Sequence, residues 1–193
     1  GSRAASSHTG ALASPDVAVD ALFKKAGIVR CYGREELCTV GNIFTYPHFE
    51  GKNIAIITHA GGPAVMLTDA LSKAGLNIPH IEGKQADELL TKLFPGSAVG
   101  NPIDFLATGT PEQLGTIIDY CDTKFDGIDA MCVIFGTPGL APIHEAYRVL
   151  SDKMKTAKKP IFPILPSTLV AGEEVREFVD RGNTYFADET VFG

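Results

Sequence analysis

The sequence predicts an α/β fold built on a doubly wound parallel sheet of the flavodoxin type. Short apolar runs that are rich in β-branched residues alternate with segments whose apolar residues recur at helical spacing. Glycine and proline turns separate most of these segments. Because strands and helices alternate regularly from residue 52 onward, parallel strands with helices on both faces of the sheet are the expected arrangement.

The expected elements follow one another along the chain. We expect strands at residues 28–32, 54–58, 77–80, 100–105, 130–135, 161–165 and 184–186. We expect helices at residues 15–27, 33–45, 63–74, 84–93, 111–121, 142–155 and 173–181. Ser14 and Thr110 are expected N-caps, with Pro15 and Pro111 as the first helical residues behind them. Residues 1–47 then hold only helix, strand and helix, which is too little for an independent sheet.

The chain is organised around the strand at 54–58 and the turn and helix that follow it. Gly61, Gly62 and Pro63 end the apolar run, and Pro63 suits the first turn of a helix. A strand, a glycine turn and a helix start place free N–H groups and the positive end of a helix dipole at the carboxyl edge of a parallel sheet. These three residues are therefore candidate phosphate-binding residues. The alternative is that they form an ordinary α/β turn that binds no ligand.

A second strand ends in the same way. The run at 130–135 is followed by a GTPG turn that begins with Gly136 and Thr137, and a helix is expected behind it. Ligands of open α/β sheets lie at the carboxyl ends of the strands. Gly136 and Thr137 therefore join the candidate phosphate-binding residues, because two helix starts at one edge would concentrate positive potential without any basic side chain.

Composition excludes several classes of function. The formal net charge is −6, tryptophan is absent, and lysine and arginine form no block, which argues against nucleic acids and anionic membranes as partners. No apolar run approaches the roughly 20 residues of a membrane span. The four cysteines show no CxxC spacing, so we expect reduced thiols, no metal site and a cytoplasmic protein.

His8 stands apart from the other histidines because of its setting. It lies in a segment of small residues just before an expected helix, and Gly10 gives the backbone there freedom to bend. A neutral imidazole with a pKa near about 6.5 is a competent nucleophile toward phosphorus at neutral pH. On the residues alone, His8 remains either a loop residue or a nucleophile. His48, His80 and His144 are interpreted as surface or supporting residues.

Three motifs occur in one order and at one spacing. Residues 6–13 read SSHTGALA, residues 58–63 read THAGGP and residues 100–105 read GNPIDF. Together they resemble the NDP-forming acyl-CoA synthetases, the ADP-forming acetyl-CoA synthetase branch of the succinyl-CoA synthetase superfamily. The resemblance covers essentially the whole chain. It implies that His8 is the histidine that is phosphorylated during turnover.

The resemblance also implies a domain organisation. Residues 1–47 would be the C-terminal part of the phosphohistidine domain, and residues 48–193 a second succinyl-CoA-synthetase-like flavodoxin domain. A CoA-binding Rossmann domain and an ATP-grasp domain or subunit would lie elsewhere. The implied reaction interconverts acyl-CoA, ADP and phosphate with a carboxylic acid, ATP and CoA, and a mobile phosphohistidine loop carries the phosphoryl group. CoA, ADP or ATP and Mg²⁺ are expected for the complete enzyme. This fragment is expected to bind none of them and to be inactive by itself.

This chain departs from the usual family motifs at four positions. Ser14, Ala64 and Phe105 replace a glycine, a glycine and a leucine, which are mild changes. His59 replaces an asparagine and adds a titratable group beside the phosphate turn, so it is a candidate modulator of phosphate affinity with pH; a harmless substitution is the alternative.

Two other functions remain open from the sequence. A non-catalytic ligand-sensing or docking module, of the kind fused to acetyltransferases, would use the same pair of domains. A flavodoxin-like mononucleotide binder is the third candidate, but no loop rich in Ser and Thr follows the first strand of the expected flavodoxin domain. The intact SSHTGALA motif favours the catalytic interpretation.

Overall fold

The computed structural model describes residues 15–136, 144–166 and 171–193. The chain divides into two compact units, residues 1–40 and residues 41–193, and each is described by itself. The domain boundary expected between residues 47 and 48 concerns the family's domains and stays a prediction.

The first unit contains helix α2 (Asp16–Ala26) and the start of helix α3 (Arg34–Ile43). Pro15 occupies the N-cap position of α2, one place earlier than expected, and Ser14 lies outside the described residues. Gly27 ends the helix in the left-handed conformation with φ of 69°. None of the residues of these two described helices is buried.

The strand expected at 28–32 is wrong. The segment between α2 and α3 has no strand conformation, and the side chains of Ile28 and Val29 are half exposed. Apolar, β-branched residues favour a strand, but strand structure also needs a pairing partner, and the described part of this unit provides none.

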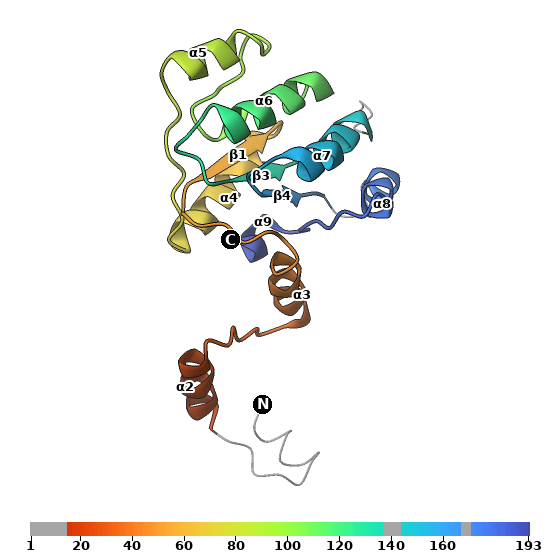
Figure 1. The fold of residues 1–193 in the computed structure, drawn as a ribbon. Coiled ribbons are helices and arrows are strands. Elements are labelled where there is room, and N and C mark those ends of the chain that lie inside the picture. Colours follow the sequence, from red (N-terminus) through yellow and green to blue (C-terminus); the bar gives the residue numbers. More distant parts are fainter. Residues whose placement is uncertain (1–14, 137–143, 167–170) are drawn as a thin grey trace. The chain divides into compact units, whose positions relative to one another are not determined.

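The second unit contains a four-stranded parallel sheet in the order β2-β1-β3-β4 (Figure 1). Its strands are β1 (Ile54–Thr58), β2 (Ile103–Asp104), β3 (Ala130–Ile134) and β4 (Ile161–Ile164). All residues of β1 and β3 are buried, as expected for central strands that are covered on both faces. The predicted parallel α/β fold is confirmed.

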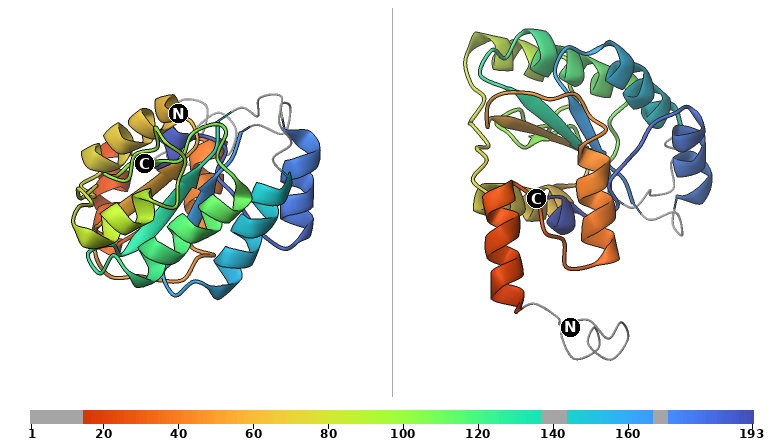
Figure 2. Two further views of the ribbon diagram at one scale, coloured as in Figure 1. Left: turned by 90° about the horizontal axis from the view of Figure 1, so that it is seen from above. Right: turned by 60° about the horizontal axis from the view of Figure 1, so that its bottom comes forward.

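Helices cover both faces of this sheet, as two further views show (Figure 2). The helices of one face are α5 (Lys84–Leu90), α6 (Pro111–Thr123), α7 (His144–Thr156) and α8 (Gly172–Asp180), and those of the other are α4 (Gly61–Lys73) and α9 (Glu189–Phe192). Successive side chains of β1 point to opposite faces, so Ile57 packs in the α6 layer and Ile56 in the α4 layer.

Two expected strands are reduced to single bridges. Residues 77–80 contribute only the pairing of Asn77 with Asn53, and residues 184–186 contribute only the pairing of Phe186 with Ile164. In the first case the reason is visible, because a side chain from the 100–105 motif takes the place of a neighbouring strand along β1.

Helix boundaries agree closely with the local sequence signals. Thr110 and Gln113 form a reciprocal capping box at the start of α6, with Pro111 in the first helical position as expected. Helix α4 begins at Gly61, two residues before the expected start, and Gly75 with φ of 89° follows its C-cap. The short helix α9 was not expected from the sequence.

Candidate functional site

The carboxyl ends of β1 and β3 lie side by side. Thr58 pairs with Ile134 in the parallel register, so the turns that follow the two strands are neighbours. They come very close, because a Cβ atom added to Gly136 would lie 2.8 Å from the Cβ of Ala60. In sheets of this strand order, the junction between these two strands is where ligands bind.

Helix α4 begins directly at this junction with an uncapped end. Ala60 is the N-cap residue, in an extended conformation, and its side chain has no atom that accepts a hydrogen bond. Gly61 and Gly62 follow, both exposed, and Pro63 has no N–H. The helix therefore presents the N–H groups of Gly61 and Gly62 together with the positive end of its dipole.

The turn before α4 is held by the hydroxyl group of Thr58. This buried Oγ1 accepts a hydrogen bond from the backbone N–H of Ala60 at 2.9 Å and donates one to the Ala60 carbonyl at 2.8 Å. The N–H of Ala60 is thereby used internally, and the next two N–H groups remain available for a ligand.

Asp104 contributes a negative charge to the same edge. Its Oδ1 accepts a hydrogen bond from the N–H of Leu106 at 2.9 Å, which is the usual role of a turn carboxylate. Its Oδ2 lies 3.7 Å from the place that a Cβ on Gly61 would occupy. A carboxylate this close to the helix start opposes the binding of an anion.

His59 lies between the rings of two phenylalanines. Its ring centre is 5.0 Å from that of Phe135 and 6.3 Å from that of Phe105. Its Nδ1 atom is buried and has no hydrogen-bond partner among the described residues. Burial lowers the pKa of His59, and the nearby Asp104 carboxylate opposes this shift in part. The imidazole is therefore neutral at pH 7.

The structure thus brings together the candidate residues Gly61, Gly62, Gly136 and His59 at one edge, with Pro63 in the first turn of α4. His8 and Thr137 lie outside the described residues. Within the described ranges, no group of three or more His, Cys, Asp or Glu side chains is placed to hold a metal ion.

Asn101 has a structural role that sequence reasoning missed. Its Oδ1 accepts a hydrogen bond from the N–H of Ile56 at 2.9 Å, and its Nδ2 donates to the carbonyls of Ile54 at 2.9 Å and Pro79 at 3.0 Å. One side chain thereby satisfies the edge of β1 between the Asn77 bridge and β2. The motif that contains Asn101 thus holds β1, and with it the turn that leads to α4.

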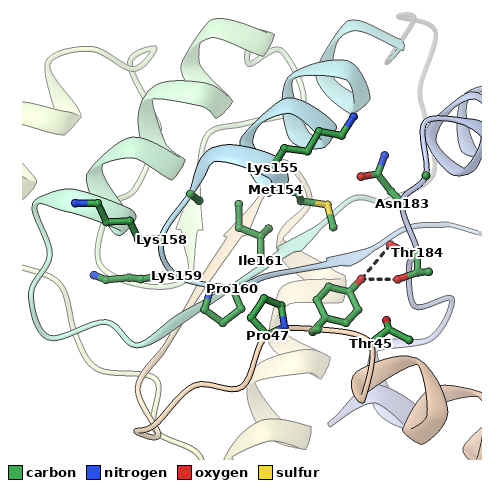
Figure 3. Close-up of a pocket in the computed structure, with 13 residues that line it drawn as sticks. Thr45, Pro47, Met154, Lys155, Lys158, Lys159, Pro160, Ile161, Asn183 and Thr184 are labelled. Carbon is green, nitrogen blue, oxygen red and sulfur yellow. Dashed lines mark hydrogen bonds between the residues drawn. The ribbon is translucent and has the colours of Figure 1, made fainter.

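A hollow lies at the opposite end of the strands, near the start of β4 (Figure 3). It has a volume of about 360 Å³, and its lining includes Pro47, Ile161 and two lysines, Lys155 and Lys158. Figure 3 shows the amino groups of these two lysines pointing away from each other. Lys159 also lines it, but its Nζ donates to backbone carbonyls of Cys121 and Phe125. The amino groups of these lysines therefore do not converge on one anion site in the hollow.

Comparison with known proteins connects the chain to one family. The family model for the succinyl-CoA ligase like flavodoxin domain matches residues 1–44. The α subunit of ADP-forming acetate–CoA ligase II from Pyrococcus furiosus is 32% identical over 196 residues, covering 99% of this chain and 43% of the relative. The ADP-forming 4-hydroxybutyrate–CoA ligase of Nitrosopumilus maritimus is 32% identical over 188 residues, covering 95% of this chain and 26% of the relative.

These matches support the NDP-forming acyl-CoA synthetases as the family of this chain. The chain spans less than half the length of these two synthetases. A solved synthetase structure agrees in fold: the dinucleotide-forming acetyl-coenzyme A synthetase 1 of Ca. Korarchaeum cryptofilum, in complex with phosphate and ADP, superposes with a TM-score of 0.84 at 22% identity, covering 100% of this chain and 42% of that one. Within the described ranges, no helix has the length and apolar character of a membrane span.

Proposed function

We propose that this chain is part of an acyl-CoA synthetase that interconverts acyl-CoA, ADP and phosphate with a carboxylic acid, ATP and CoA. Its role is to dock a phosphoryl group at the carboxyl edge of the sheet while His8 carries that group between reaction centres. The observation that carries this proposal is the uncapped start of α4, where the exposed Gly61 and Gly62 adjoin Gly136.

The electrostatics of α4 support phosphoryl docking. A helix of this length presents about half a positive charge at its N-terminus, concentrated on the free N–H groups of the first turn. Phosphoryl transfer depends mainly on positioning and on preorganised donors around the oxygens, which these amides supply. Gly136 allows the β3 turn to approach the same place, because a side chain there would collide with Ala60.

The proposed reaction proceeds in three balanced steps. Phosphate attacks the acyl carbon of acyl-CoA, which gives an acyl phosphate and releases CoA. The imidazole of His8 attacks phosphorus and displaces the carboxylate, giving phosphohistidine. The β-phosphate of ADP then attacks the phosphohistidine, which forms ATP and restores neutral His8.

The complete enzyme needs further binding parts. We propose that a CoA-binding Rossmann domain holds the acyl-CoA and that an ATP-grasp domain or subunit holds the nucleotide with Mg²⁺. The relatives, named as ADP-forming ligases, are more than twice as long as this chain and have room for such parts. These 193 residues alone should then show no turnover.

Labelling of the complete enzyme tests the proposal. The full-length protein is incubated with ATP that carries radioactive phosphate at the γ position, and acid-labile protein-bound phosphate is counted. We expect incorporation in the wild type and none in His8→Ala, with His48→Ala as a control that removes an exposed histidine from another part of the chain. Absence of acid-labile phosphate in the wild type would instead favour the ligand-sensing module.

A further inference from the structure

We propose that His59 takes up a proton when an anion docks at the start of α4, so that anion binding at this edge is coupled to pH. This inference rests on the proposed docking function and assigns the regulation of that site to one side chain. The resulting imidazolium compensates for the carboxylate of Asp104, which lies at the same edge.

One ring nitrogen of His59 lacks a hydrogen-bond partner among the described residues. Its Nδ1 is buried beside Phe135 and Phe105 and has no partner in the part of the chain that the structure describes. A neutral imidazole there holds either an unused acceptor or an unused donor at this atom. The position is therefore unfavourable for a residue with a purely structural role.

The charges around His59 come from few sources. The end of β2 contributes Asp104, which among the described residues is the charged group that acts on His59. The end of β3 contributes the apolar ring of Phe135, and behind that ring lies Tyr147 of α7, with ring centres 5.1 Å apart. The start of α4 contributes backbone amides and no acidic residue in its first turn.

An anion at Gly61 and Gly62 changes this balance. The ligand brings its negative charge close to the carboxylate of Asp104, whose Oδ2 is already within 3.7 Å of the Cβ position at Gly61. Two negative charges beside one imidazole favour its protonated form much more than one does. The proton on His59 then offsets part of the repulsion, and the ligand binds more tightly where that proton is available.

The sign of the pH dependence follows from linkage. In the free protein burial holds the pKa of His59 below its ordinary value, and the docked anion raises it. Affinity is therefore highest below the pKa of the free protein and falls as the pH rises through the pKa of the complex. An upward shift of one pKa unit corresponds to a tenfold change in affinity, and nearby opposite charges shift a pKa by about 1–3 units.

An NMR titration of the isotopically labelled 193-residue chain tests the coupling. Sulfate is the probe, with inorganic phosphate in parallel, because sulfate keeps one charge state across the pH range. The amide shifts of Gly61 and Gly62 report binding, and the Cε1–H shift of His59 reports its pKa. We expect sulfate to raise this pKa by at least one unit and its own affinity to fall about tenfold or more from pH 5 to pH 8.

Matched variants separate this inference from the docking function. His59→Asn, and His59→Gln as a second variant, should bind sulfate with nearly constant affinity across the same pH range. His48→Asn removes an exposed histidine and should keep the wild-type dependence. If sulfate leaves the Gly61 and Gly62 amides unchanged, the docking function itself is wrong. If sulfate binds there but the pKa of His59 does not move, or if the His59 variants keep the pH dependence, the coupling is overturned.

Discussion

Replacing Asn101 with alanine should destabilise the second unit more than any exposed polar substitution. The side chain bonds the N–H of Ile56 and the carbonyl of Ile54, which belong to a fully buried strand, and also the carbonyl of Pro79. Asparagine also tolerates the left-handed φ of 72° at this position better than alanine does. Both effects act in the same direction.

The magnitude can be estimated from these contacts. A buried backbone group left without a partner costs about 1–3 kcal/mol, and two such groups on β1 lose theirs. Water that enters the space left by the side chain recovers part of this, so we expect a loss of about 3 kcal/mol in the free energy of unfolding. With a urea m-value of about 2 kcal/mol/M, the unfolding midpoint should fall by about 1.5 M.

Urea unfolding of the 193-residue chain, followed by circular dichroism, measures this shift. Asn77→Ala is the matched control, because its exposed amide bonds only the side chain of Asn53 in the described structure, at 3.1 Å. It should change stability by no more than about 0.5 kcal/mol. Asn101→Gly relieves the backbone strain but still removes the amide, and should keep most of the loss.

Two results would refute this reasoning. If Asn101→Ala and Asn77→Ala shift the midpoint equally, the side chain of Asn101 does not hold β1. If Asn101→Gly restores wild-type stability, the backbone conformation is what matters and the hydrogen bonds contribute little.

Three further predictions concern the site and the thiols. Gly136→Ala should cost about 1–3 kcal/mol of stability and weaken sulfate binding, because the added Cβ collides with Ala60 in the neighbouring turn. Gly62→Ala, whose Cβ points into open space, should keep both the stability and the sulfate affinity. Urea unfolding and sulfate titration compare the two variants, and equal effects would contradict the close approach of the two turns. Burial lowers the pKa of His59, so as the pH drops below about 6.5 the unfolded chain binds this proton before the folded chain does, and stability falls. Thermal melts at pH 7 and pH 5 should therefore show a smaller loss of stability for His59→Asn than for the wild type. A loss as large as that of the wild type would contradict the burial of His59. Burial also raises the pKa of the Cys121 thiol to about 12. A thiol reagent should therefore modify the exposed Cys38 rapidly and Cys121 only after unfolding. Rapid modification of Cys121 in the native protein would contradict its burial.

Much of the fold follows from local patterns in the sequence. The buried strands β1, β3 and β4 are short apolar runs, and the start of α6 is marked by a threonine, a proline and a glutamine at capping-box spacing. These signals act over a few residues, so they can be recognised without knowledge of the tertiary structure. The glycine turn after β1 is of the same kind.

The remaining features depend on contacts between distant segments. The role of Asn101 could not be predicted, because its partners in β1 are more than 40 residues away in the sequence. The environment of His59 is set by Phe105 and Phe135, which come from the ends of two other strands. The strand expected at 28–32 is wrong for the same reason, since apolar β-branched residues do not by themselves supply a strand partner.

The central claim is that an anion docks on the backbone amides where β1 and β3 end. The most direct measurement is the change in amide chemical shifts across the 193-residue chain as sulfate is added at pH 6. The proposal predicts saturable shifts at Gly61, Gly62 and Gly136 that are larger than those elsewhere among the described residues. Saturable shifts confined to Lys155 and Lys158 at the opposite end of the strands, with the three glycines unmoved, would contradict it.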